Sequence, residues 1–102
     1  MTTMIADDLD ATVQQANELL RGLGPAAVSH RPSPDRWTIK EVVGHLIDSA
    51  ANNHQRFVRA QLSDELVFPK YDQNEWVRVQ QYDSLQWQDL VGLWLHYNRL
   101  LV

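Results

Sequence analysis

WTIKEVVGHLIDSAANNHQRF, residues 37–57, carries the clearest structural signal in this 102-residue chain. Thr38 and Glu41 have the T-x-x-E spacing of a capping box, in which each side chain satisfies the backbone N–H at the other position. Trp37 and Val42 flank this box at the spacing of a hydrophobic staple. These residues together predict the first turn of a long helix.

A second helix is predicted before this one. Its apolar residues recur at steps of three and four, and the pattern stops near Gly22–Gly24. They are Ile5, Leu9, Val13, Ala16, Leu19 and Leu20. The stretch GLGPAAVSHRPSPDR, residues 22–36, holds three of the four prolines and is predicted to be a connector.

The helix that begins near Thr38 is predicted to continue to about Gln61. An irregular link at residues 67–69 follows, and then a short helical turn that holds Trp76. Asp83 or Ser84 is a suitable cap for a third long helix. Its pattern comprises Leu85, Leu90, Val91, Trp94, Leu95, Asn98 and Leu101. No useful strand-like alternation occurs, so the predicted fold is all-α with three long helices.

The apolar pattern of the third helix continues to Val102, where helices ordinarily show a stop signal. We therefore expect a bundle whose fourth helix is missing or is supplied by a partner copy. The chain is interpreted as a single, partial domain over residues 1–102.

The charge and composition of the chain argue against some classes of function. Thirteen acidic and nine basic residues give a net charge of −4, and no basic block is present, which argues against nucleic-acid binding. The chain contains no cysteine, no apolar signal segment and no apolar run of about 18 residues. A bacterial-type cytoplasmic protein without membrane contact is therefore expected.

A row of polar residues follows one side of the helix that contains residue 45. At about 100° per residue these residues fall within a narrow arc. They are Glu41, His45, Asp48, Asn52 and Arg56. The other side is predicted to face the core through Val43, Leu46, Ile47, Ala50 and Phe57. The row is consistent either with a solvated face or with one wall of a site.

Histidine placement does not define a metal site by itself. Zinc-like ions need three or four ligands, and the paired histidines of H-E-x-x-H are absent. His54 should point away from His45, His30 lies in the connector, and His96 lies on the third helix. The four tryptophans are interpreted as core anchors.

The segment from Trp37 to Gln61 resembles the second-helix region of the DinB-like superfamily. Members commonly show W-[ST]-x-x-E, then G-H-L and an acidic residue; here these are Trp37, Thr38, Glu41, Gly44, His45, Leu46 and Asp48. The stretches FPKYDQNEWVRVQQY and LWLHYNRLL are also similar, so that the resemblance covers roughly residues 5–102.

The resemblance implies a four-helix bundle in which His45 is a metal ligand. Two further histidines usually come from the fourth helix, and the metal is nickel or zinc. Related branches are thiol-dependent enzymes, including bacillithiol transferases and mycothiol-dependent isomerases. Four further residues would line the pocket or orient His45 without contacting the metal: Glu41, Asp48, Asn52 and Arg56. The resemblance gives none of them a catalytic role.

Two functions are therefore carried forward. The first is a metal-dependent enzyme of thiol-dependent transferase or hydrolase type, which uses a divalent metal, a low-molecular-weight thiol and a small-molecule substrate. A single chain is expected to be incomplete for this activity. The second is a non-catalytic helical module that associates with itself as a homodimer, because a truncated bundle is expected to expose the apolar stripe that contains Leu90, Val91 and Trp94.

Overall fold

The computed structural model describes residues 3–62 and 71–101, and every regular element in these ranges is helical. The elements are α1 (Thr3–Arg21), α2 (Pro25–Ser29), α3 (Ile39–Leu62), α4 (Gln73–Gln80), the 3-10 turn η1 (Tyr82–Ser84) and α5 (Trp87–Leu101). The prediction of an all-α protein is confirmed, and α1, α3 and α5 correspond to the predicted long helices. The link predicted at residues 67–69 lies outside the described residues.

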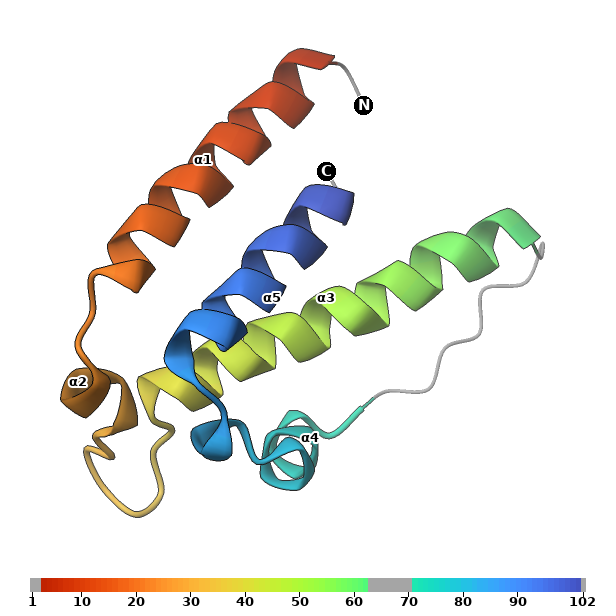
Figure 1. The fold of residues 1–102 in the computed structure, drawn as a ribbon. Helices are drawn as coiled ribbons and strands as arrows, with labels where there is room; N and C mark the ends of the chain where they lie inside the picture. The colour runs from red at the N-terminus through yellow and green to blue at the C-terminus, as the bar shows by residue number, and fades with distance from the viewer. Residues whose placement is uncertain (1–2, 63–70, 102) are drawn as a thin grey trace.

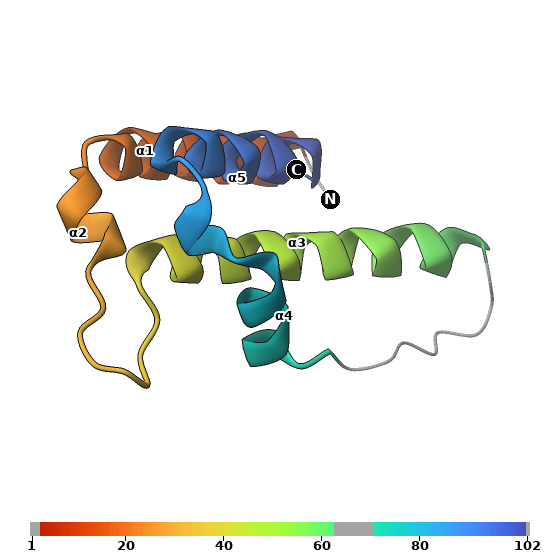
Figure 2. The ribbon, with the colours of Figure 1, turned by 60° about the horizontal axis from the view of Figure 1, so that its bottom comes forward.

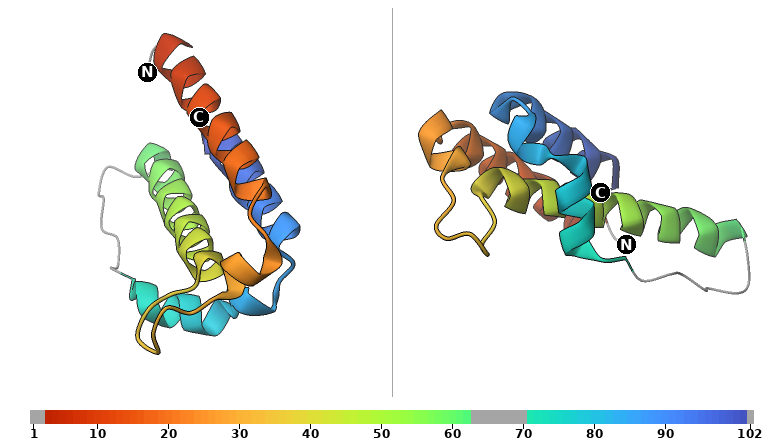
Figure 3. Two further views of the ribbon diagram at one scale, coloured as in Figure 1. Left: turned by 90° about the vertical axis from the view of Figure 1, so that its left-hand side faces the viewer. Right: turned by 90° about the horizontal axis from the view of Figure 1, so that it is seen from below.

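The long helices form two layers. α1 and α5 run side by side in opposite directions, and Figure 2 shows α3 as a second layer beside them. α3 and α5 meet near their first turns and diverge toward their last turns (Figure 1). Figure 3 shows α2 near the end where α3 begins, and α4 crossing the first half of α3. None of the described helices is long and apolar enough to cross a membrane.

The core lies where α3, α5, α2 and η1 meet. Its buried members come from all of these elements and from α4: Val28, Val43, Ile47, Val77, Tyr82, Trp87, Leu90 and Val91. Leu20, Trp37 and Trp94 pack against this cluster from its rim. The indole N–H of Trp87 also donates to the Leu20 carbonyl at 2.8 Å, which ties α5 to the end of α1.

The predicted capping box is present at the start of α3. The backbone N–H of Thr38 donates to Glu41 Oε1 at 3.1 Å, and the backbone N–H of Glu41 donates to Thr38 Oγ1 at 3.1 Å. The short predicted helix around Trp76 is also confirmed as α4, whose N-cap Asp72 accepts from two backbone N–H groups. The local signal at Thr38 and Glu41 therefore places the start of α3 correctly.

The prediction for the apolar side of α3 is wrong at two positions. Val43, Ile47 and Ala50 are buried as expected, but the exposed fraction is 44% for Leu46 and 55% for Phe57. The core is built on the side of α3 that faces α5, α4 and η1, and these two residues lie to one side of it. α3 diverges from α5 toward its last turns, and Phe57 belongs to the second half of α3.

Two predicted boundaries also need correction. The connector at residues 22–36 contains α2, which begins with Pro25 and buries Val28 completely. The third long helix is not capped by Asp83 or Ser84, because these residues form η1 instead. The first backbone bond of α5 joins the Leu90 N–H to the Gln86 carbonyl.

Candidate functional site

His45 lies in the second turn of α3, beside the indole ring of Trp37. The two ring centroids are 5.1 Å apart, and the ring planes are inclined by 40°. His45 Nδ1 is buried and has no hydrogen-bond partner among the described residues. A buried ring nitrogen that forms no bond is costly, so this atom requires a partner that the described contacts do not supply.

Asp48 lies one turn after His45 and is the most buried member of the polar row, with an exposed fraction of 1%. Its Oδ1 accepts a short hydrogen bond from the Tyr82 hydroxyl and a second bond from Gln80 Nε2 at 3.3 Å. Its Oδ2 is buried without a hydrogen-bond partner in the described part of the chain. A solvated face therefore does not describe Asp48.

The ring of Tyr82 rests on the backbone of Gly44. A Cβ atom at residue 44 would overlap three atoms of this ring, so only glycine allows the approach. Burial of the Tyr82 hydroxyl, together with its bond to the Asp48 carboxylate, raises the pKa of Tyr82 well above the usual range. The glycine of the G-H-L motif thus has a packing role next to His45.

Sequence reasoning did not identify Tyr82 as part of this site. The available signal was Gly44 itself, since an interior glycine costs a helix about 1 kcal/mol relative to alanine and often marks a close approach. That signal indicates that something packs on α3 at residue 44. It does not show that the packing group comes from residue 82, which is 38 positions away in the sequence.

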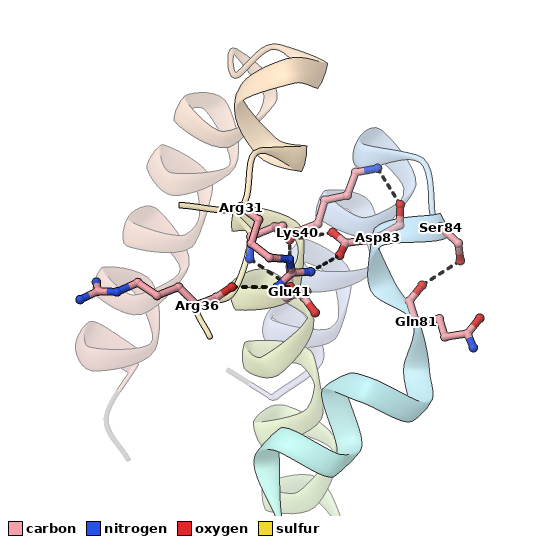
Figure 4. Close-up of polar contacts among 8 residues, drawn as sticks. Arg31, Arg36, Lys40, Glu41, Gln81, Asp83 and Ser84 are labelled. Carbon is pink, nitrogen blue, oxygen red and sulfur yellow. Dashed lines mark hydrogen bonds and ion pairs between the residues drawn. The ribbon is translucent and has the colours of Figure 1, made fainter. Parts of the chain in front are cut away.

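The turn that holds Tyr82 is fastened to the first turns of α3 by its neighbour Asp83 (Figure 4). Asp83 accepts from Thr38 Oγ1 at 2.7 Å and forms an ion pair with Arg31 at 3.0 Å. The Lys40 ammonium donates to the backbone carbonyls of Asp83 and Leu85. These contacts hold η1 against α3 and so fix the position of Tyr82 over Gly44.

The remaining residues of the polar row have local partners. Glu41 closes the capping box and forms an ion pair with Arg31 at 2.8 Å, as Figure 4 shows. Asn52 Nδ2 donates to the backbone carbonyl of Asp48 at 2.8 Å. Arg56 is half-buried, one turn further along α3. The structure therefore packs His45 against Trp37, bonds Asp48 to Tyr82, and leaves Glu41 in the helix cap.

The other histidines lie away from His45. The ring of His54 hydrogen-bonds to the Tyr97 hydroxyl on α5 at 2.8 Å, so it faces α5. His30 and His96 are exposed, in the connector and on α5. Within residues 3–62 and 71–101, no group of three histidine, aspartate or glutamate side chains could hold a metal ion. The described residues therefore do not complete a metal site around His45.

A surface hollow of about 490 Å³ lies between the connector and the start of α4. Trp37 and Val42 form part of its lining, and Gln73 and Asn74 contribute from α4. His45 is not among its lining residues, although its ring packs against Trp37. A smaller hollow of about 230 Å³ also adjoins the motif, through Trp37 and Glu41.

Residues 8–97 match the family model described as the DinB superfamily. No curated protein and no solved structure is significantly similar to the chain. The matched range contains α3, α4, η1 and most of α1 and α5, and with them every residue of the candidate site.

Proposed function

Since this chain belongs to the DinB superfamily, we propose that it is a metal-dependent enzyme of the thiol-dependent transferase or hydrolase type. His45 is the proposed ligand of a divalent ion, nickel or zinc. The observation that carries the proposal is the position of His45 in the G-H-L motif, inside the range that matches the family model and with its ring packed against Trp37. A cytoplasmic location is part of the proposal and fits a chain without cysteine.

The metal would supply Lewis-acid chemistry, because a bound divalent ion lowers the pKa of a thiol or of water. The described residues would contribute one ligand and its support. Trp37 restricts the orientation of the His45 ring, and Tyr82 with Gly44 fixes this part of α3 against η1. The other ligands must come from outside the described residues or from a second copy of the chain.

The test is a calorimetric titration of the whole chain with Ni²⁺ and with Zn²⁺. The proposal predicts saturable binding in the wild type and loss of that binding in His45→Ala. His96→Ala is the matched control, since His96 is exposed on α5 and should not affect binding. Equal binding by the wild type and His45→Ala would contradict the assignment of His45, and no binding by the wild type would contradict the metal-dependent function.

The prediction that Leu90 and Val91 form the exposed association surface is wrong, because both are buried in the core. A second candidate function, self-association as a homodimer, is favoured instead by an apolar stripe on α3. The stripe consists of Val42, Leu46 and Phe57, which share one side of the helix at 100° per residue. Their exposed fractions are 43%, 44% and 55%. Exposed apolar side chains favour association, and a two-fold pairing would bury the stripe of each copy against the other.

A further inference from the structure

We propose that Asp48 is the positioning residue for His45: the imidazole Nδ1–H donates to Asp48 Oδ2 and leaves the lone pair on Nε2. This inference does not require metal binding, although its consequence for a metal rests on the function proposed above. It assigns to Asp48 a role that neither the helix cap nor the other members of the polar row can take.

The first argument is that two buried atoms each lack a hydrogen-bond partner, and that each could be the partner of the other. His45 Nδ1 and Asp48 Oδ2 are the buried side-chain atoms without a hydrogen-bond partner in the described residues. The Nδ1 atom of His45 can carry a proton and donate it to a hydrogen bond. The Oδ2 atom of an ionised Asp48 carboxylate can only accept. Because an unsatisfied buried polar group costs about 1–3 kcal/mol, one bond between the two removes two penalties together.

The second argument is geometric. His45 and Asp48 are separated by three residues on α3, and residues at this spacing lie about 5–6 Å apart at Cβ on the same side of a helix. The imidazole and carboxylate arms can span that gap through a change of side-chain torsions, with the helix backbone unchanged. Trp37 packs against the imidazole ring and limits how far it can turn away.

The third argument is that neighbouring groups on this side of α3 already have partners. Glu41 Oε1 accepts from Thr38 and pairs with Arg31. The Ser49 hydroxyl bonds to the Tyr71 hydroxyl at 2.9 Å. The two donors to the Asp48 carboxylate, Tyr82 and Gln80, both use Oδ1 and leave Oδ2 for another donor.

The consequence concerns which imidazole nitrogen can act. A bond from Nδ1–H to a carboxylate fixes the tautomer in which Nε2 has the free lone pair. That nitrogen can then bind a metal ion or accept a proton. A carboxylate behind a ligating imidazole also orients the ring, and its loss typically costs about 10–100-fold in metal affinity.

The test is nitrogen-15 NMR of the His45 ring at a pH of about 8.5, where histidine side chains are ordinarily neutral. The proposal predicts the Nδ1–H tautomer in the wild type. In Asp48→Asn the amide oxygen can still accept from Tyr82, but the amide N–H₂ would face Nδ1. This variant should therefore shift the population toward the Nε2–H tautomer.

Tyr82→Phe is the matched control, because it removes a donor to Asp48 Oδ1 and leaves Oδ2 intact. It should lower stability and keep the wild-type tautomer. An Nε2–H tautomer in the wild type, or an unchanged Nδ1–H tautomer in Asp48→Asn, would overturn the proposal. If Asp48→Asn does not fold, the His45 tautomers of the wild type and of Tyr82→Phe still test the proposal.

Metal titration of the same proteins separates this inference from the proposed function. Asp48→Asn should bind Ni²⁺ about 10–100-fold more weakly than the wild type, while Tyr82→Phe should bind it within a few-fold. A wild type that binds no metal but shows the predicted tautomers would refute the metal-dependent function and support the role of Asp48.

Discussion

Tyr82 lies so close to Gly44 that a methyl group at residue 44 would overlap its ring. The hydroxyl of the same tyrosine reaches Asp48, one turn further along α3. The Tyr82 side chain from η1 therefore contacts α3 at residue 44, just before His45, and at residue 48, about one turn after it. This contact joins the G-H-L motif to a segment nearly 40 positions later in the sequence, and it determines how the site is held.

Gly44→Ala should destabilise the protein, although alanine is the better helix former. The overlap with Tyr82 requires the ring or η1 to move, which typically costs about 1–3 kcal/mol. Helix propensity alone would favour alanine by about 1 kcal/mol. Urea denaturation measures the difference.

Gly92→Ala is the control for this change. Gly92 also lies inside a helix, but a Cβ atom at residue 92 would meet Arg21 Nη2 at 3.5 Å, an ordinary contact. This variant should be neutral or stabilised by up to about 1 kcal/mol. Equal effects of the two substitutions would argue against tight packing of Tyr82 on Gly44.

Tyr82→Phe should lower the free energy of unfolding by about 1–3 kcal/mol at neutral pH, because it removes a buried hydrogen bond to a carboxylate. The ring remains on Gly44, so the fold should persist. Chemical denaturation followed by circular dichroism measures the loss. A change below about 0.5 kcal/mol would mean that the Asp48 bond contributes little.

The difference in free energy of unfolding between the wild type and Tyr82→Phe should also depend on pH. Burial and the Asp48 carboxylate raise the pKa of Tyr82 in the folded state. The resulting stability is fully present below the ordinary tyrosine pKa of about 10 and is lost as the pH rises toward the higher folded-state pKa. The stability difference between wild type and Tyr82→Phe should therefore shrink above about pH 10. A difference that stays constant to about pH 11 would contradict the shift.

Thr38→Ala should cost about 1–3 kcal/mol. It removes the acceptor for the Glu41 N–H and also the donor to Asp83, so that both the helix cap and the attachment of η1 are weakened. Thermal denaturation measures the change. Thr12→Ala is the matched control: Thr12 Oγ1 bonds to an exposed carbonyl within α1, and its loss should be nearly neutral. Equal losses in both variants would refute a special role for Thr38.

The apolar stripe on α3 predicts concentration-dependent association. Sedimentation velocity of the wild type should show a dimer that dissociates on dilution, and the double variant Leu46→Glu, Phe57→Glu should remain a monomer. Val79→Glu is the control, since Val79 is 65% exposed on α4 rather than on the stripe. A wild type that is monomeric at every concentration would exclude self-association.

Much of the fold follows from local sequence signals, because capping boxes and apolar periodicity act within a few residues. Thr38 and Glu41 mark the start of α3 correctly, and the periodic residues mark α1 and α5. The errors concern long-range contacts. Leu46 fits the apolar pattern of α3, yet no local rule shows that α5, α4 and η1 cover a different side of that helix.

Local sequence signals likewise predict only part of the candidate site. His45 and Asp48 could be named from the motif and from helical spacing. The burial of Asp48 could not be predicted, because it depends on Tyr82 and Gln80, which the chain brings back to α3 after more than 30 residues. Asp83 was predicted to cap a helix, but tertiary contacts with Thr38 and Arg31 take its carboxylate instead.

The most direct test of the proposed function is elemental analysis of the untagged chain, purified without added metal, beside His45→Ala and His96→Ala. Nickel or zinc at about one ion per chain or per two chains is expected in the wild type and in His96→Ala. The His45→Ala protein should contain none. Absence of metal from all three proteins, or equal metal in all three, would contradict the account of His45 as a metal ligand.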